Sequence, residues 1–309
     1  MSYEIGNPIT YTPQVIADRL ISDISSNESQ QASLETELST GNRINQPSDD
    51  PAGTATVMQL NSSIARANQY VANANDGLGW LSLGNSTMNS ILSGLQQVRQ
   101  LVVSVTSAQL TGGSTALQGI SQQVDSVRSQ LLNLSNTLYD GQAIFAGTGN
   151  VTNAYDANGN YVGGGSAPTR TVAPGTQVSI SVTGPDIFGT GSDGLLGPNG
   201  ILAQISQDIS TGSTASLQKL KTTDWPALDA ATNQTESQAA VLGANYQRMQ
   251  GFVNQAQAAQ TALQTEASSI DGANVATTMS NLSQAQTSYQ AALWAVSQLS
   301  QSDLVKFLG

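Results

Sequence analysis

The stretch LQGISQQVDSVRSQLLNLSNTL, from Leu117 to Leu138, carries the strongest structural signal in the chain. Its apolar residues follow one another at alternating steps of three and four: Leu117, Ile120, Val124, Val127, Leu131, Leu134 and Leu138. Such spacing keeps one apolar stripe on the same side of an α-helix, and an unbroken stripe is typical of a helix that packs on other helices. We therefore predict a core helix over Leu117–Leu138.

Two other stretches follow the same rule. One runs from Leu81 to Val105, and the turn signal TGGST at Thr111–Thr115 predicts that it packs antiparallel to the first helix. The other runs from Ala239 to Leu263 with smaller and more polar residues. The predicted helical core comprises Leu95, Val98, Val102, Leu117, Ile120, Val124, Val127, Leu131, Leu134, Leu138, Leu242, Tyr246 and Met249.

The two ends of the chain carry similar stripes that Asn, Gln and Ala dilute. Few large apolar residues lie between Val15 and Leu38, and their burial offsets the backbone entropy of a helix only if a partner covers them. We expect this arm to be disordered in the free monomer and helical on assembly. The predicted assembly interface comprises Leu20, Ile24, Leu34, Leu38, Val275, Met279, Leu282, Tyr289, Leu293 and Val296.

Between residues 140 and 200 the period changes. The stretch RTVAPGTQVSISV predicts two short strands joined at Pro174-Gly175, and YDANGNY predicts a tight turn through Asn158-Gly159. We expect a small β-rich insertion at the tip of a helical hairpin. The expected fold is mainly α: an elongated antiparallel helical bundle or coiled coil formed by the N- and C-terminal arms. Its expected divisions are 1–45, 46–139, 140–200, 201–270 and 271–309.

The stretch LSTGNRINQPSDDPAG, from Leu38 to Gly53, places two acids side by side. Gly41 is suited to end the first helix, and Ser48 or Asp49 is suited to cap the next one, with Asp50 and Pro51 in its first turn. A catalytic acid pair is the alternative. It is disfavoured because neighbouring residues at a helix start point apart and no third group is implied.

Composition excludes several classes of function. With a net charge of −11 and ten Lys and Arg spread singly, the chain has no basic stripe for nucleic acid and no patch for an anionic membrane. It has no Cys and no His, so disulfides, thiolate metal sites and the commonest general base are absent. No run of about 18 apolar residues exists, and MSYEIGNPITYTPQ does not resemble a cleavable secretory signal. We expect no cofactor, no metal and no enzyme.

A calcium loop is a weak alternative at Asp156, Asn158 and Asn160. The glycine falls at the fourth position of such a loop rather than the sixth, and Ala167 stands where a Glu would be needed. A plain polar turn is the favoured interpretation.

A second alternative is that aromatic residues bind a ligand such as a sugar. Trp80, Trp225 and Trp294 could stack on a ligand, but tryptophans at helical spacing are more often packing or interface residues. A cluster of exposed aromatics in the insertion would favour a secreted adhesin or a carbohydrate-binding module, and Tyr155, Tyr161 and Phe188 are the residues available there.

The stretch LSTGNRINQPSDDPAG also resembles the N-terminal signature of the bacterial flagellin family, with Arg43, Pro47, Asp49, Asp50 and Pro51 as its motif loop. The end of the chain, from Ala273, resembles the C-terminal helix of that family. Three further pieces resemble its hook-filament junction branch: GQAIFAGT at 141–148, GPDIFG at 184–189 and VLGANYQRMQ at 241–250.

This resemblance implies a structural protein of the extracellular flagellum that is exported without a cleavable signal peptide. It implies self-association in a ring or helical layer between a hook-side junction protein and filament flagellin, after an export chaperone has held the C-terminal part. A filament flagellin with a short outer domain is the nearest alternative, and the adhesin or carbohydrate-binding module is more remote.

Overall fold

The computed structural model describes residues 13–107, 113–149, 151–191 and 194–308. The chain divides into two compact units: a terminal unit of residues up to 64 and from 261, and a central unit of residues 65–260. The division falls within two long helices, α2 (Pro51–Thr106) and α7 (Trp225–Asp271).

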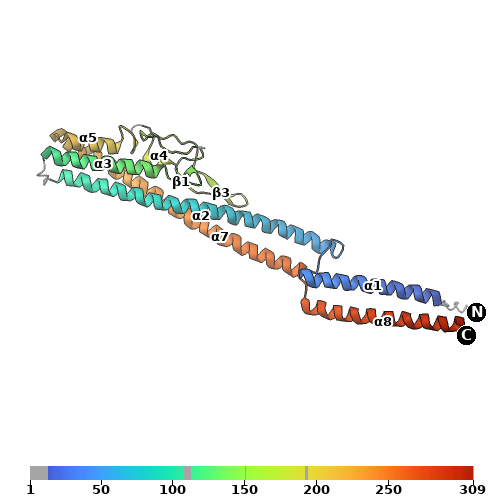
Figure 1. The fold of residues 1–309 in the computed structure, drawn as a ribbon. Helices are drawn as coiled ribbons and strands as arrows, with labels where there is room; N and C mark the ends of the chain where they lie inside the picture. Colours follow the sequence, from blue (N-terminus) through green and yellow to red (C-terminus); the bar gives the residue numbers. More distant parts are fainter. Residues whose placement is uncertain (1–12, 108–112, 150, 192–193, 309) are drawn as a thin grey trace, which may run out of the picture. The chain divides into compact units, whose positions relative to one another are not determined.

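In the terminal unit, α1 (Pro13–Thr40) and α8 (Val275–Leu308) lie side by side and run in opposite directions (Figure 1). Each helix turns one stripe of half-buried or buried residues toward the other, at alternating steps of four and three. On α1 these residues are Leu20, Ile24, Asn27, Gln31, Leu34 and Leu38, and on α8 they are Thr278, Leu282, Ala285, Tyr289, Ala292 and Val296. We call this contact the arm seam.

The central unit is built on α2, α3 (Gly113–Ser135), α5 (Ile201–Thr211) and α7. Val124, Val127 and Leu131 of α3 are at most 3% exposed, and α3 packs against α5 (Figure 1). Glycines allow helices to approach α2 closely. A Cβ added at Gly94 would lie 2.9 Å from Leu131 Cδ2, and one at Gly77 would lie 2.6 Å from Met249 Cε. The core thus joins α2 to α3 on one side and to α7 on another.

The predicted helix over Leu117–Leu138 ends three residues early, at Ser135. Leu138 lies instead in β1 (Leu138–Tyr139), where it is 49% exposed, so its place in the predicted helical core is wrong. β1 forms a hairpin with β2 (Gln142–Ala143) around Asp140 and Gly141, which both have positive φ. This turn ends the helix, although the apolar spacing continues for one more step.

The turn predicted at Thr111–Thr115 is only partly described. Thr111 and Gly112 lie outside the described residues, while Gly113 begins α3 with a φ of +63°. Gly41 behaves as predicted at the end of α1: its φ is +73° and its N–H donates to Glu37 O at 2.9 Å.

The small β insertion is confirmed. β3 (Thr169–Ala173) pairs antiparallel with β4 (Thr176–Ser179), and Pro174-Gly175 joins them as predicted. The insertion lies against the middle of α2 rather than at the tip of the helical hairpin. Arg170 pairs with Asp76 at 2.6 Å, and Asn73 Nδ2 donates to Thr171 O at 2.9 Å.

Short elements complete the central unit. A loop and α4 (Gly184–Phe188) follow β4, and Arg128 of α3 anchors the loops by donating to Asn158 O and Leu196 O. After α5, α6 (Thr214–Lys219) leads into a single π-helical turn, η1 (Leu220–Asp224), which runs directly into α7.

Candidate assembly site

The motif loop that follows α1 is hydrogen-bonded to the segment that precedes α8. Arg43 N–H donates to Asp271 O at 2.6 Å, and Ala273 N–H donates to Gly41 O at 2.9 Å. These bonds form a short antiparallel bridge between Asn42 and Gly272. Residues 230 apart in sequence therefore meet at one end of the arm seam.

The two acids of the motif have separate structural roles. Asp49 Oδ2 accepts the N–H groups of Asn45 at 3.0 Å and Gln46 at 2.8 Å, which closes the turn that contains Pro47. Asp50 Oδ1 accepts Gly53 N–H at 2.8 Å, so Asp50 is the residue that caps α2. The prediction that Ser48 or Asp49 is the cap is wrong by one or two residues, because Pro51 occupies the first helical position.

The electrostatics of Asp50 favour its charged form. The N–H of Gly53 and the nearby guanidinium of Arg43 hold the pKa of the Asp50 carboxyl below its usual range. Arg43 Nη2 lies 3.1 Å from Asp50 Oδ2. A carboxylate held ionised in this way is a poor proton donor, and the neighbouring Asp49 is engaged with backbone amides. The pair forms a helix start and a turn rather than an acid–base site.

The residues of the predicted assembly interface fall into two sets. Seven of them contribute to the arm seam within the chain: Leu20, Ile24, Leu34, Leu38, Leu282, Tyr289 and Val296. Val275, Met279 and Leu293 instead face away from it and are 53%, 60% and 45% exposed. With Trp294, which is 69% exposed, they form what we call the outer face of α8.

Sequence reasoning missed the seam residues Thr278, Ala285 and Ala292. Reading only large apolar residues selects a stripe that begins at Val275, whereas every second position of the seam on α8 holds a small residue. The signal that could have found them is the matching order of steps on α1 and α8, which is four, three, four, three, four on both stripes.

The other residues of the predicted helical core lie in the central unit. Leu95, Val98, Val102, Leu242 and Met249 are fully buried, as are Val124 and Leu131, and Val127 is nearly so. Leu117, Ile120, Leu134 and Tyr246 are partly buried and pack against this core.

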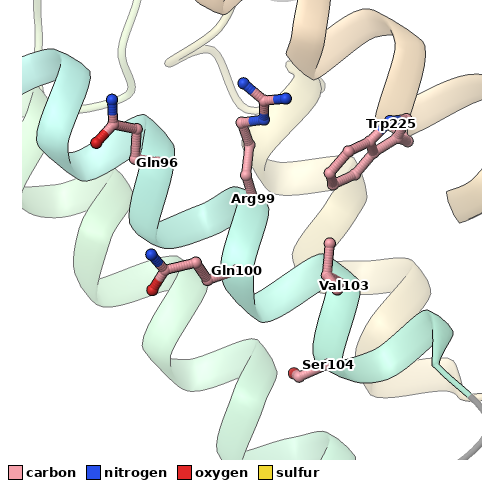
Figure 2. A pocket seen from close by; sticks show the side chains of 6 residues that line it. All are labelled: Gln96, Arg99, Gln100, Val103, Ser104 and Trp225. Carbon is pink, nitrogen blue, oxygen red and sulfur yellow. The ribbon is translucent and has the colours of Figure 1, made fainter.

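A cavity of about 590 Å³ lies beside Trp225 in the central unit. Figure 2 shows Gln96, Arg99, Gln100, Val103 and Ser104 on α2, with Trp225 reaching toward them from the start of α7. Arg99 Nη2 forms an ion pair with Asp229 Oδ1 at 3.0 Å, and Arg99 Cζ lies 5.4 Å from the centroid of the Trp225 ring. The lining of the cavity offers a cation, amides and apolar surface, which suits packing or binding better than catalysis.

The three tryptophans occupy different environments. Trp80 is 4% exposed and packs on Tyr139, whereas Trp225 borders the cavity and Trp294 lies on the outer face of α8. The aromatics of the insertion turn inward: Tyr155 and Phe188 are each 2% exposed, and Tyr155 also packs on Tyr161. They do not form an exposed platform for a sugar.

The candidate calcium loop is closed on itself. Asp156 Oδ1 accepts hydrogen bonds from the backbone N–H groups of Asn158 at 2.9 Å and Asn160 at 2.8 Å. Asp156 Oδ2 accepts one from the side-chain amide of Asn160. These bonds lower the pKa of the Asp156 carboxyl. Among the described residues, no three His, Cys, Asp or Glu side chains gather in a way that could hold a metal. The polar turn accounts for this stretch.

No described helix combines the length and the apolar character that crossing a membrane requires.

Comparison with known proteins identifies the family. Residues 12–150 match the model of the bacterial flagellin N-terminal helical region, and residues 226–308 match that of the C-terminal helical region. The chain belongs to the bacterial flagellin family. The resemblance of the motif loop to the flagellin signature is thereby confirmed. Flagellins are structural proteins, and the family is not known as a family of enzymes.

Individual relatives come from two branches of the flagellin family. Flagellar hook-associated protein 3 of Salmonella typhimurium is 28% identical over 177 residues, covering 57% of this chain and 55% of that protein. The flagellin of Bacillus subtilis is 26% identical over 285 residues, covering 90% of this chain and 91% of that protein. The chain thus spans about half the length of the curated hook-associated protein that it matches.

Solved structures share the fold. A flagellar hook-associated protein from Vibrio parahaemolyticus has a TM-score of 0.64 at 18% identity, covering 72% of this chain and 100% of that one. The flagellar junction protein FlgL from Legionella pneumophila has a TM-score of 0.54 at 12% identity, with the same coverage.

Proposed function

We propose that this flagellin-family chain is a structural subunit of the bacterial flagellum that joins the hook to the filament. The observation that carries the proposal is its similarity to flagellar hook-associated protein 3 of Salmonella typhimurium and Escherichia coli, at 28% and 26% identity. The solved structures from Vibrio and Legionella, named as hook-associated and junction proteins, support it at the level of the fold.

The outer face of α8 is the proposed contact with neighbouring subunits. A helix face with several large apolar side chains in water is unusual for a monomer, and covering each one stabilises a complex by roughly 1.5 to 3 kcal/mol. Its proposed partners are copies of this chain in a ring or helical layer, a hook-side junction protein and filament flagellin. When the arm seam is closed, α1 covers one side of α8 and leaves this face free for a neighbouring subunit.

The route out of the cell belongs to the same proposal. The chain would pass through the flagellar export channel, with an export chaperone on its C-terminal part, and act outside the cell. The arm seam supports this route, because most of its residues are only half-buried and five of the twelve are polar or small, so the seam costs little to open.

A filament flagellin is the second candidate. The alignment with the flagellin of Bacillus subtilis favours it, because that alignment covers nine-tenths of both chains. The two candidates differ in position and copy number: a junction subunit occupies one boundary, whereas a flagellin fills the shaft.

Antibody-gold labelling of isolated flagella tests the proposal. We expect label at the boundary between hook and filament, and label along the whole shaft would make this chain a flagellin. A variant with Val275, Met279 and Leu293 changed to Ser should be exported but absent from the boundary. The matched control changes Met58 and Val241, which are 68% and 43% exposed elsewhere, and should still be incorporated.

A further inference from the structure

Arg43 connects both linkers that lead to the terminal arms. Its backbone N–H donates to Asp271 O, and its Nη2 donates to Asp50 Oδ2 at 3.1 Å and to Ile270 O at 2.9 Å. The same residue thereby holds the cap of α2 and the last turn of α7. We call residues 41–50 together with 270–273 the linker clamp.

Other contacts close the linker clamp around Arg43. Ile44 N–H donates to Asp271 Oδ1 at 3.2 Å, and Gly272 N–H donates to Ser268 O at 2.8 Å. A Cβ at Gly272 would lie 2.4 Å from Ser268 O, so the segment passes here only because this residue is glycine. The clamp is a hydrogen-bonded unit with little freedom to slide.

Two contacts carry the alignment of the linker clamp into the arms. Thr278 Oγ1 donates to Glu37 Oε1 at 2.9 Å, and Gln31 Nε2 donates to Ala285 O at 3.2 Å. From the Asn42–Gly272 bridge to the first contact, five residues back along α1 correspond to six forward along α8, and from the first contact to the second, six correspond to seven. One register therefore runs from the clamp along the described arms and places Leu34 opposite Leu282.

The arm seam alone distinguishes this register poorly from its neighbours. Its steps repeat every seven residues, so a slide of seven residues keeps both stripes facing each other. Such a slide would move Leu34 from Leu282 to Tyr289, and Leu38 from Thr278 to Ala285. With Asn27 and Gln31 on α1, and small residues on α8, little apolar burial depends on the choice.

We propose that Arg43 is a positioning residue that fixes the register of α1 against α8 through the linker clamp. The clamp sets the axial position of the outer face of α8 relative to the exposed residues of α1, Val15, Ile16 and Ile21. This inference concerns the register that α1 and α8 take whenever the arm seam is closed, and it does not depend on the proposed function.

Disulfide trapping in the full chain tests the proposal, because the chain has no Cys of its own. One double variant, Leu34→Cys with Leu282→Cys, reports the observed register. A second, Leu34→Cys with Tyr289→Cys, reports a slide of seven residues. With Arg43 present we expect the first pair to cross-link about tenfold more than the second, and Arg43→Gln should reduce that preference to within about twofold.

Controls separate the linker clamp from general charge effects. Arg19→Gln removes the same charge from an exposed position of α1 and should preserve the preference. Asp50→Asn removes the carboxylate partner of Arg43 but keeps an oxygen that can accept Gly53 N–H, so α2 stays capped while the preference falls. The proposal would be overturned if cross-linking still favoured the Leu34–Leu282 pair about tenfold in Arg43→Gln and in Asp50→Asn. It would also be overturned if the parent with Arg43 showed no preference for that pair.

Discussion

At the residue scale, Asp224 is a carboxyl group placed where its charge is costly. Its side chain is 3% exposed, and Oδ2 has no hydrogen-bond partner in the described structure. Lys219 Nζ lies 3.9 Å from Asp224 Oδ1 but only 2.7 Å from Asp208 Oδ2, so the cation is shared between the two acids. Burial, and then the neighbouring Asp208, raise the pKa of Asp224 to about 6.

This raised pKa predicts a dependence of stability on pH. The folded chain keeps a proton on Asp224 that the unfolded chain releases near pH 3.8. The contribution of protonated Asp224 to the free energy of unfolding is therefore fully present below pH 3.8 and is lost as the pH rises through about 6. Asp224→Asn should therefore unfold at a temperature a few degrees higher than the parent at pH 7.5, and the difference should shrink toward pH 4. Calorimetry over this range measures it.

Asp208→Asn is the matched control for that prediction. It removes the neighbouring acid that raises the pKa of Asp224 and leaves Lys219 to Asp224, so the gain from Asp224→Asn at pH 7.5 should be smaller in an Asp208→Asn background. An Asp224→Asn variant that is less stable than the parent at pH 7.5 would show that the buried charge is compensated.

The motif loop shows what the sequence can decide at this scale. The end of α1 at Gly41 and the start of a helix near Asp50 follow from local chemistry. The predicted choice of cap is wrong, because Ser48 and Asp49 are equally good caps by residue type, and the structure uses Asp50 directly before Pro51. The pairing of Arg43 with Asp271 and Ile270 joins segments remote in sequence, and no local pattern reveals it.

At the element scale, α3 shows that apolar spacing defines a helix better than it defines the end of one. The spacing predicts both Leu131 and Leu138, yet Leu131 is fully buried and Leu138 is 49% exposed beyond the helix end. The turn at Asp140-Gly141 needs positive φ, which a glycine and a neighbouring Asp supply. The turn at Asp140-Gly141 therefore ends α3 at Ser135, although the apolar spacing continues as far as Leu138.

These two leucines form a matched pair for mutation. Leu131→Ala should lower the free energy of unfolding by roughly 2 to 5 kcal/mol, because it leaves a cavity between α2 and α3. Leu138→Ala should change it by less than about 0.5 kcal/mol, since the side chain is half exposed. Urea unfolding followed by circular dichroism measures both, and equal losses would contradict the packing described for α3.

The arms show a second limit at this scale. Helical character at both ends of the chain follows from the sequence, but the seam on α8 does not, because Ala and Thr carry little signal in a search for large apolar residues. The seam on α8 alternates Leu282, Tyr289 and Val296 with Thr278, Ala285 and Ala292, and a search for large apolar residues finds only half of it.

At the scale of the whole molecule, the two units differ in how much apolar surface they bury. The central unit holds nearly all of the fully buried side chains, whereas the described arms are half-buried at best apart from Thr278 and Ala285. In a dilute monomer we expect fast amide exchange at residues 15–38 and 275–298, and protection at residues 117–135. Mass spectrometry of exchanged peptides measures this, and slow exchange throughout both arms would count against folding coupled to assembly.

The junction role is the central claim, and deletion of the gene tests it most directly. A junction subunit is needed once, at the boundary, however much filament protein the cell makes. Electron microscopy of the deletion strain should show hooks without filaments, with filament protein lost to the medium. Restoring the full chain should restore the filaments, and restoring a chain cut after Gly272 should not. A deletion strain that still grows full-length filaments would contradict the junction role.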